Sequence, residues 1–164
     1  MSIRDASLAE HPAPSGVGSA GRKQGHKAEF HRRFMADDLE TRHALEALVV
    51  VLGQEGIDET VVSNAELILA EVLNNVVEHA YAEGTGPVEL TVGILPGGLS
   101  CEVADQGKPL PAGMVPPPDL PEASPDSLPE GGFGWHIIRC LTSDLSYTRE
   151  SGENRLTLQI PWTD

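Results

Sequence analysis

Three polar side chains recur at intervals of four residues within one largely apolar stretch, Leu69 to Tyr81: Glu71, Asn75 and His79. In a helix, this spacing places a carboxylate, an amide and an imidazole along one edge. Carboxylate or amide oxygens on that edge could hold Mg²⁺ beside a phosphate, and a carboxylate could orient a nucleophile. Taken alone, however, residues in this pattern more often form the solvated face of an amphipathic helix.

Two further motifs carry groups that suit a phosphate-bearing ligand. Asp105-Gln106-Gly107 follows an alternating segment, so its carboxylate is expected at a strand end, where it could accept the exocyclic amine of a purine. Gly131-Gly132-Phe133-Gly134 precedes a segment with helical spacing, and a glycine-rich turn that opens a helix presents backbone N–H groups to phosphate. It is not a Walker loop, because no Gly-Lys-Ser/Thr follows, and it is not a dinucleotide fingerprint, because no strand directly precedes it.

The elements that must position these motifs follow from the spacing of apolar residues. It predicts, in order, a strand over 28–36, helices from Asp37 or Asp38 to Gly53 and from Asp58 to about Gly84, strands over 88–94 and 99–103, a helix over 135–141, and strands over 145–149 and 155–160. A turn at 151–154 joins the last two strands. Runs of adjacent strands beside helices favour an α+β sandwich with helices on one face of the sheet.

The chain divides into a tail and one domain. Residues 1–27 are rich in Gly, Ser, Ala and Lys without periodicity, and they predict a flexible tail. Residues 28–164 predict a single domain. Within it, residues 108–130 hold eight of the thirteen prolines, which excludes a long helix or a central strand. A loop of this length in a compact domain is typically functional or disordered.

The composition of the chain limits the kinds of molecule that it could bind and the cellular compartment in which we expect it. Hydrophobic residues make up 40% of the chain but aromatic residues only 4%, so the core should be aliphatic. The net charge of −14 argues against a nucleic-acid partner and suits either a basic protein partner or solubility alone. No apolar run reaches the length of a membrane span and no signal-peptide core is present, so we expect a cytoplasmic protein without a membrane partner. Cys101 and Cys140 are both expected to be small buried residues rather than a disulfide.

In this order, the three motifs resemble those of the GHKL ATP-binding superfamily, or Bergerat fold, which includes histidine kinases and gyrase. The resemblance is strongest to bacterial anti-sigma-factor serine protein kinases of the RsbW type and covers about residues 28–162. It rests on Glu71-Val-Leu-Asn-Asn75-Val-Val-Glu-His79, Asp105-Gln-Gly107 and Gly131-Gly-Phe-Gly134-Trp-His-Ile-Ile-Arg139. It implies a two-layer α/β sandwich with a mostly antiparallel mixed sheet and helices on one face.

The resemblance implies roles for the matching residues. Asn75 would coordinate the Mg²⁺ that bridges the phosphates of ATP, and Glu71 would be the general base that activates the acceptor serine hydroxyl. Asp105 would bind adenine, and Gly107 would let the backbone approach the base. His79 falls where the family often has a histidine, within the nucleotide site.

The resemblance also assigns the loop, with one difference from the family pattern. Residues 108–130 would form the ATP lid, and Gly131, Gly132, Phe133 and Gly134 would border the phosphates. The family motif at Asp105 often continues to another glycine, whereas Lys108-Pro109 follow here. This pair stiffens the loop, and Lys108 could itself reach a phosphate.

By this resemblance, the protein is an ATP- and Mg²⁺-dependent protein serine kinase and an anti-sigma factor. It would bind a sigma factor, release it when an unphosphorylated antagonist of the STAS type binds, and phosphorylate that antagonist on serine. Members commonly form homodimers. Two alternatives stay open: a partner-switch regulator that binds nucleotide without significant kinase activity, which Lys108-Pro109 motivates, and a regulator that applies the same switch to an effector other than a sigma factor.

Overall fold

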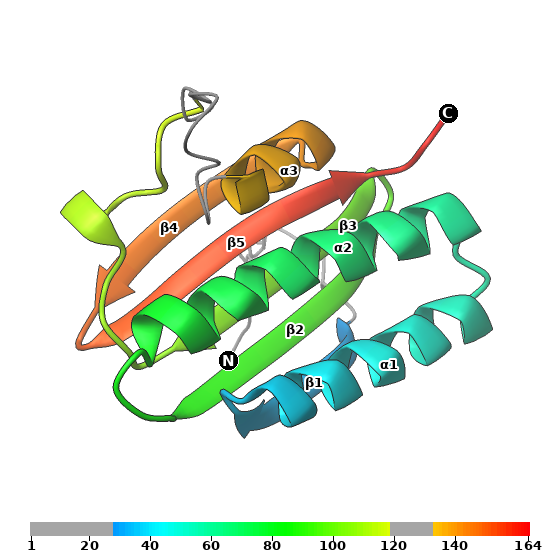
Figure 1. Ribbon diagram of the computed structural model, residues 1–164. Helices are drawn as coiled ribbons and strands as arrows, with labels where there is room; N and C mark the ends of the chain where they lie inside the picture. The colour runs from blue at the N-terminus through cyan, green and yellow to red at the C-terminus, as the bar shows by residue number, and fades with distance from the viewer. Residues whose placement is uncertain (1–27, 119–132) are drawn as a thin grey trace, which may run out of the picture.

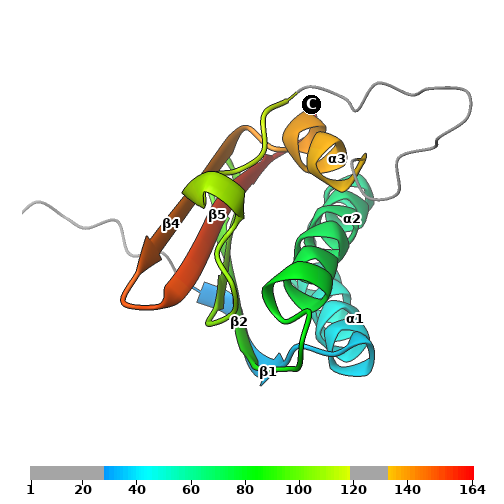
Figure 2. The same ribbon diagram turned by 60° about the vertical axis from the view of Figure 1, so that its left-hand side comes forward.

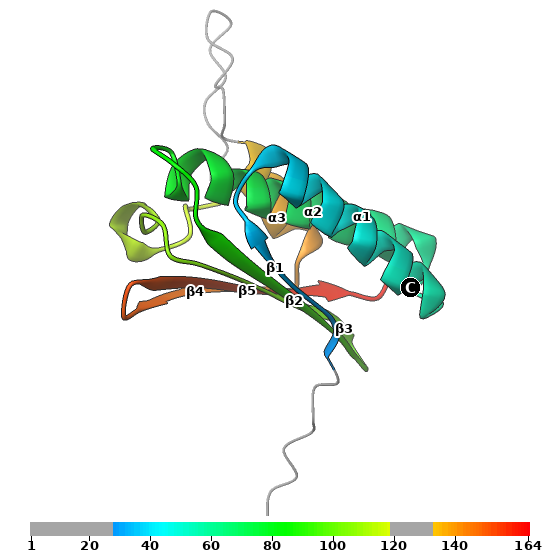
Figure 3. The ribbon, with the colours of Figure 1, turned by 90° about the horizontal axis from the view of Figure 1, so that it is seen from below.

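The protein folds as a two-layer sandwich in which helices cover one face of a five-stranded sheet (Figure 1). Figure 3 shows the two layers edge-on, with the helices on one side of the strands. This computed structural model describes residues 28–118 and 133–164. The predicted tail, the part of the predicted lid from 119 to 130, and Gly131 and Gly132 of the glycine motif lie outside the described residues.

The sheet has the strand order β1-β2-β3-β5-β4, and each of its pairings is antiparallel. The α+β sandwich is therefore confirmed, and the described strands form no parallel pair. The strands are β1 (Ala28–Met35), β2 (Pro87–Leu95), β3 (Gly98–Asp105), β4 (Asp144–Glu150) and β5 (Glu153–Pro161). The register of β3 and β5 places Asp105 opposite Asn154.

Three helices form the second layer over the described residues: α1 (Asp38–Gln54), α2 (Glu59–Asn75) and α3 (Phe133–Leu141). Asp37 caps α1 by accepting a hydrogen bond from the Glu40 N–H at 2.8 Å. Asp58 caps α2 in the same way through the Thr60 N–H at 2.9 Å. Both residues stand where the sequence predicted a helix to begin, and they act as caps because Asp satisfies backbone donors that the first helical turn leaves without partners.

The helix that carries Glu71 and Asn75 ends differently from the prediction. α2 stops at Asn75, and the chain continues as one π-helical turn, Val76–Ala80 (η1). The Tyr81 N–H bonds the Val76 carbonyl at 3.0 Å, five residues back, so this turn is wider than an α-helical turn. The prediction of an α-helix to about Gly84 is therefore wrong beyond Asn75, and His79 does not continue the α-helical edge.

The core between the two layers is aliphatic, as the composition predicted. The largest side chains that are fully buried there are Leu48, Leu52, Val61, Ile68, Leu69, Val72, Leu73, Leu90, Leu99, Ile138, Leu158 and Ile160. Burying each Leu or Ile contributes about 1.5–3 kcal/mol. This core fixes α2 and α3 over β3 and β5, and it thereby positions the polar residues at the ends of these elements. Among the helices of the described segments, none combines the length and the apolar character that crossing a membrane requires.

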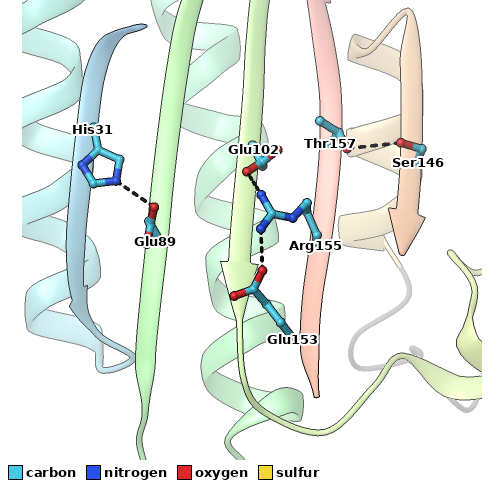
Figure 4. A network of polar contacts seen from close by, with 7 residues as sticks. All are labelled: His31, Glu89, Glu102, Ser146, Glu153, Arg155 and Thr157. Carbon is cyan, nitrogen blue, oxygen red and sulfur yellow. Dashed lines mark hydrogen bonds and ion pairs between the residues drawn. The ribbon is translucent and has the colours of Figure 1, made fainter. Parts of the chain in front are cut away.

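The other face of the sheet carries polar side chains that pair across strands (Figure 4). Arg155 on β5 forms ion pairs with Glu102 on β3 and with Glu153. His31 on β1 lies 2.9 Å from Glu89 on β2. Exposed pairs of this kind contribute only about 0–1 kcal/mol each. They identify this face as solvated, and the core lies entirely on the helical side.

The two cysteines differ in exposure. Cys101 on β3 is buried, and burial raises the pKa of its thiol to about 12. Cys140 on α3 is exposed, so the expectation that it is buried is wrong. Of the residues on this short helix only Ile138 is fully buried, so the side that carries Cys140 faces solvent.

We expect an aromatic disulfide reagent at about pH 8 to label one cysteine in the folded chain and both after denaturation, since the thiolate is the reactive form. A Cys140→Ser variant should react only when unfolded. Rapid labelling of that variant under native conditions would contradict the burial of Cys101.

Candidate functional site

A cavity between the helical layer and the sheet brings together four of the predicted site residues. Its volume is about 60 Å³, and Asn75, His79, Asp105 and Lys108 contribute to its lining. The other walls are mostly apolar and come from Val72, Val76, Val103, Leu110, Trp135 and Leu156, among others. Apolar walls with a few convergent polar groups are typical of small-molecule sites. The chain after β3 passes across β5 and β4 at this end of the sheet (Figure 2).

Asp105 is a buried carboxylate at the end of β3, only 7% exposed. Its Oδ1 accepts hydrogen bonds from the Gly107 N–H and from Asn154 Nδ2, each at 2.8 Å. Burial raises the pKa of this carboxyl, while those two hydrogen bonds and the nearby Arg149 charge oppose the increase. No donor among the described residues bonds Oδ2, so this atom can accept a hydrogen bond from a ligand amine.

Asn154 is a site residue that the sequence patterns did not reveal. It is 3% exposed, and besides Asp105 its Nδ2 donates to the carbonyls of Gly107 at 3.3 Å and Lys108 at 3.1 Å. The sequence assigned it to the turn at 151–154. The structure places it in β5, directly opposite Asp105 in the strand register. Only the register of two distant strands could have identified it.

Asn75 lies at the end of α2, on the wall of the cavity. Its Nδ2 is buried and has no hydrogen-bond partner among the described residues. A buried amide without a partner costs about 1–3 kcal/mol, and such a group in a folded protein calls for an explanation such as a bound water or ion. If the side-chain amide of Asn75 is rotated by half a turn, its oxygen takes the position of Nδ2.

Glu71 lies one helical turn before Asn75 and contacts the beginning of α3. A Cβ atom at Gly134 would lie 2.6 Å from Glu71 Oε2, so glycine is needed there for the carboxylate to lie this close. The structure therefore places the helix edge that carries Glu71 next to the glycine motif that ends at Gly134. Phe133, the first residue of α3, is 47% exposed beside this contact.

Gly107 is required by packing against the end of η1. A Cβ atom there would lie 2.4 Å from the Ala80 carbonyl oxygen, which accepts a hydrogen bond from the Lys108 N–H at 2.8 Å. The turn after β3 is thereby fixed against the helical layer. The Lys108 ammonium forms an exposed ion pair with Glu83 at 3.3 Å, so in this structure it points to a carboxylate.

Comparison with known proteins identifies relatives of this chain. Residues 34–160 match the family model of the histidine kinase-like ATPase domain. The serine/threonine-protein kinase BtrW of Bordetella bronchiseptica is 35% identical over 89 residues, which cover 54% of this chain and 62% of that protein. The serine-protein kinase RsbW of Bacillus cereus is 27% identical over 95 residues, which cover 56% of this chain and 59% of that protein. The alignments thus span about three fifths of these relatives.

A solved structure supports the fold. The RsbU and RsbW domains of Rv1364c from Mycobacterium tuberculosis match 82% of this chain and 32% of that chain, with a TM-score of 0.58 and 18% sequence identity. Together with the family match over most of the chain, the comparison leads to one assignment. The chain belongs to the histidine kinase-like ATPase domain family of the GHKL type, and its relatives include serine-protein kinases of the RsbW type.

Proposed function

We propose that this cavity, which at about 60 Å³ is too small for a whole nucleotide, receives the adenine end of ATP, and that the protein transfers the γ-phosphoryl group to a serine of a partner protein. The observation that carries this proposal is the presence, in one cavity, of the buried Asp105 carboxylate and of Asn75, whose buried Nδ2 has no hydrogen-bond partner among the described residues. Asp105, on the sheet side of the cavity, would offer Oδ2 to the amine of adenine, and Asn75, on the helical side, would lie near the phosphates. The kinase names of the relatives support phosphoryl transfer to protein.

Mg²⁺ would be held together with the nucleotide. Within residues 28–118 and 133–164, no group of three or more His, Cys, Asp and Glu side chains could hold a metal ion by itself. Mg²⁺ commonly keeps several waters and uses one or two protein groups beside substrate phosphates, so the amide oxygen of Asn75 fits this need. When bound, the metal neutralises charge on the phosphates. Gly131, Gly132, Phe133 and Gly134 would border those phosphates, with His79 and Lys108 nearby.

Glu71 would act as the general base. The serine Oγ forms a bond to the γ-phosphorus, the bond from that phosphorus to the β–γ bridging oxygen breaks, and the serine proton moves to the Glu71 carboxylate. ADP is the leaving group. Phosphoryl transfer depends mainly on positioning and charge neutralisation. The contact of Glu71 with Gly134, one helical turn from Asn75, supports a fixed position for this carboxylate.

We further propose that the protein is an anti-sigma factor in a partner switch. It would bind a sigma factor, and its phosphoryl acceptor would be an antagonist of the STAS type, with the protein acting as a homodimer in the cytoplasm. The RsbW-type relatives support the partner switch, whereas the homodimer and the location rest on the family resemblance alone. The specific alternative is a nucleotide-binding switch without significant kinase activity. The Lys108-Pro109 pair favours this alternative. In the family, the motif that begins at Asp105 often continues to another glycine, and here Lys108-Pro109 follow instead.

Transfer of radiolabelled phosphate from ATP to a purified STAS-type antagonist tests the assignment of Glu71 and Asn75. Glu71→Gln should slow transfer by about 10²- to 10⁴-fold, the usual contribution of a general base, while ATP binding persists. Asn75→Ala should weaken Mg²⁺-dependent ATP binding as well, because it removes the proposed metal ligand.

Two neighbouring residues give matched controls. Glu78→Gln and Asn74→Ala make the same chemical changes at exposed positions of the same helical segment, and both should transfer at the wild-type rate. Wild-type transfer by Glu71→Gln would contradict the role of Glu71. ATP binding by the wild-type protein without any transfer would instead favour the non-kinase alternative.

Asp105→Asn should stabilise the fold at neutral pH while weakening ATP binding by about 10- to 100-fold, the worth of a hydrogen bond to a charged group. Asparagine keeps an acceptor oxygen for Gly107 and Asn154 but removes a buried charge. Because folding raises the pKa of Asp105, the carboxyl contributes stability below its unfolded pKa of about 3.9, and this contribution is lost as pH rises through the folded pKa.

Urea unfolding at two pH values measures this effect. The variant should have the higher midpoint at pH 7, and its advantage should shrink as the pH falls towards about 4. A lower midpoint for Asp105→Asn than for the wild type at pH 7 would show that the ionised carboxylate stabilises the fold.

A further inference from the structure

Tyr147 connects the loop that follows β3 with the Asp105–Asn154 pair. Its hydroxyl donates to Asn154 Oδ1 at 2.6 Å and accepts a hydrogen bond from the Leu110 N–H at 3.1 Å. Tyr147 lies on the edge strand β4, is half-buried, and lines the same cavity as Asp105 and Leu110. One hydroxyl therefore contacts both the residue that orients Asp105 and the backbone of the loop.

Arg149 supports the same arrangement from the next position on this face of β4. Its Nη1 donates to Asn154 Oδ1 at 2.5 Å and to the Gly107 carbonyl at 3.0 Å. Asn154 thus accepts two hydrogen bonds on Oδ1 and donates from Nδ2 to Asp105 and to the loop carbonyls. With both ends of its amide engaged, Asn154 has one favourable orientation, and networks of this kind strengthen their members.

The loop is therefore held at its beginning by side chains from the far edge of the sheet. Gly107, Lys108 and Leu110 each form a hydrogen bond with Asn154, Arg149 or Tyr147. Lys108, Leu110 and the prolines between and after them also form one wall of the cavity. The position of this wall and the orientation of the Asp105 carboxylate consequently depend on the same group of hydrogen bonds.

We propose that Tyr147 is a positioning residue that couples the beginning of the loop, residues 107–110, to the base-binding carboxylate Asp105. The inference rests on the proposed function, namely that this cavity binds ATP. A nucleotide that bonds Asp105 would restrict Asn154, which donates a hydrogen bond to Asp105. Asn154 in turn accepts a hydrogen bond from the Tyr147 hydroxyl. The same hydroxyl accepts the hydrogen bond of the Leu110 N–H. Tyr147 acts through these two neighbours, so its hydroxyl determines how long the nucleotide stays bound.

Tyr147→Phe tests this coupling, because it keeps the ring in the cavity wall and removes only the hydroxyl. The Leu110 N–H then loses its acceptor, and among the described residues Arg149 remains as the one donor to Asn154 Oδ1. We expect the fluorescent ATP analogue that carries its dye on the ribose to dissociate about 3- to 10-fold faster in the presence of Mg²⁺, the effect of one or two neutral hydrogen bonds. The association rate should change little.

Ser146→Ala is the matched control. Ser146 is the neighbouring residue on β4, and its hydroxyl donates to Thr157 Oγ1 at 3.2 Å on the solvated face of the sheet (Figure 4). This change also removes one hydroxyl and one hydrogen bond from the strand, but on the face away from the cavity. General loosening of β4 would affect both variants, whereas coupling through Tyr147 affects only Tyr147→Phe.

Amide hydrogen exchange of the full chain without nucleotide, read by NMR, gives a second readout. The Leu110 amide should exchange faster in Tyr147→Phe and at the wild-type rate in Ser146→Ala. Unchanged analogue dissociation in Tyr147→Phe, or equal acceleration in both variants, would overturn the inference while leaving the proposed function intact. A wild-type protein that binds no ATP analogue would overturn the proposed function, and the inference with it.

Discussion

The site depends on one hydrogen bond, from Asn154 Nδ2 to Asp105 Oδ1, across the paired ends of β5 and β3. A carboxylate that is almost fully buried loses most of its hydration, and it persists only where donors replace the water. Asn154 and the Gly107 N–H supply those donors on one oxygen, and no donor among the described residues bonds the other oxygen. Asn154 also donates to the carbonyls of Gly107 and Lys108. The orientation of the carboxylate and the path of the chain after β3 therefore depend on the same side chain.

Stability and the proposed function oppose each other at this point. Because burial raises the pKa of Asp105, folding makes the ionised form less favourable than it is in the unfolded chain, so the ionised carboxylate that would bind adenine reduces stability at neutral pH. The buried Nδ2 of Asn75, which has no partner in the part of the chain that the structure describes, is a second local cost at the same cavity. The aliphatic core beneath α2 and α3 offsets such costs, and sites that break local rules in this way are commonly functional.

The sequence predicted the parts that short-range patterns determine. Asp37 and Asp58 mark helix starts because a cap needs only a side chain and the N–H groups two or three residues ahead. Gly107 and Gly134 were recognised by motif, although the groups that a Cβ atom would meet there, the Ala80 backbone and the Glu71 carboxylate, come from distant residues. Asn154 could not be found, because its role depends on strand register. The π-helical turn after Asn75 was missed because its apolar residues continue an α-helical pattern, and Gly131 and Gly132 lie outside the described residues.

The central claim is that Asp105, held by Asn154, binds the amine of adenine. Calorimetric titration of the wild-type protein with ATP and with purine riboside triphosphate, which lacks only the exocyclic amine, tests it most directly. Removal of a ligand group that bonds a buried carboxylate leaves that carboxylate without its partner, so the account predicts binding that is weaker by at least about tenfold. Equal affinity for the two nucleotides would contradict it.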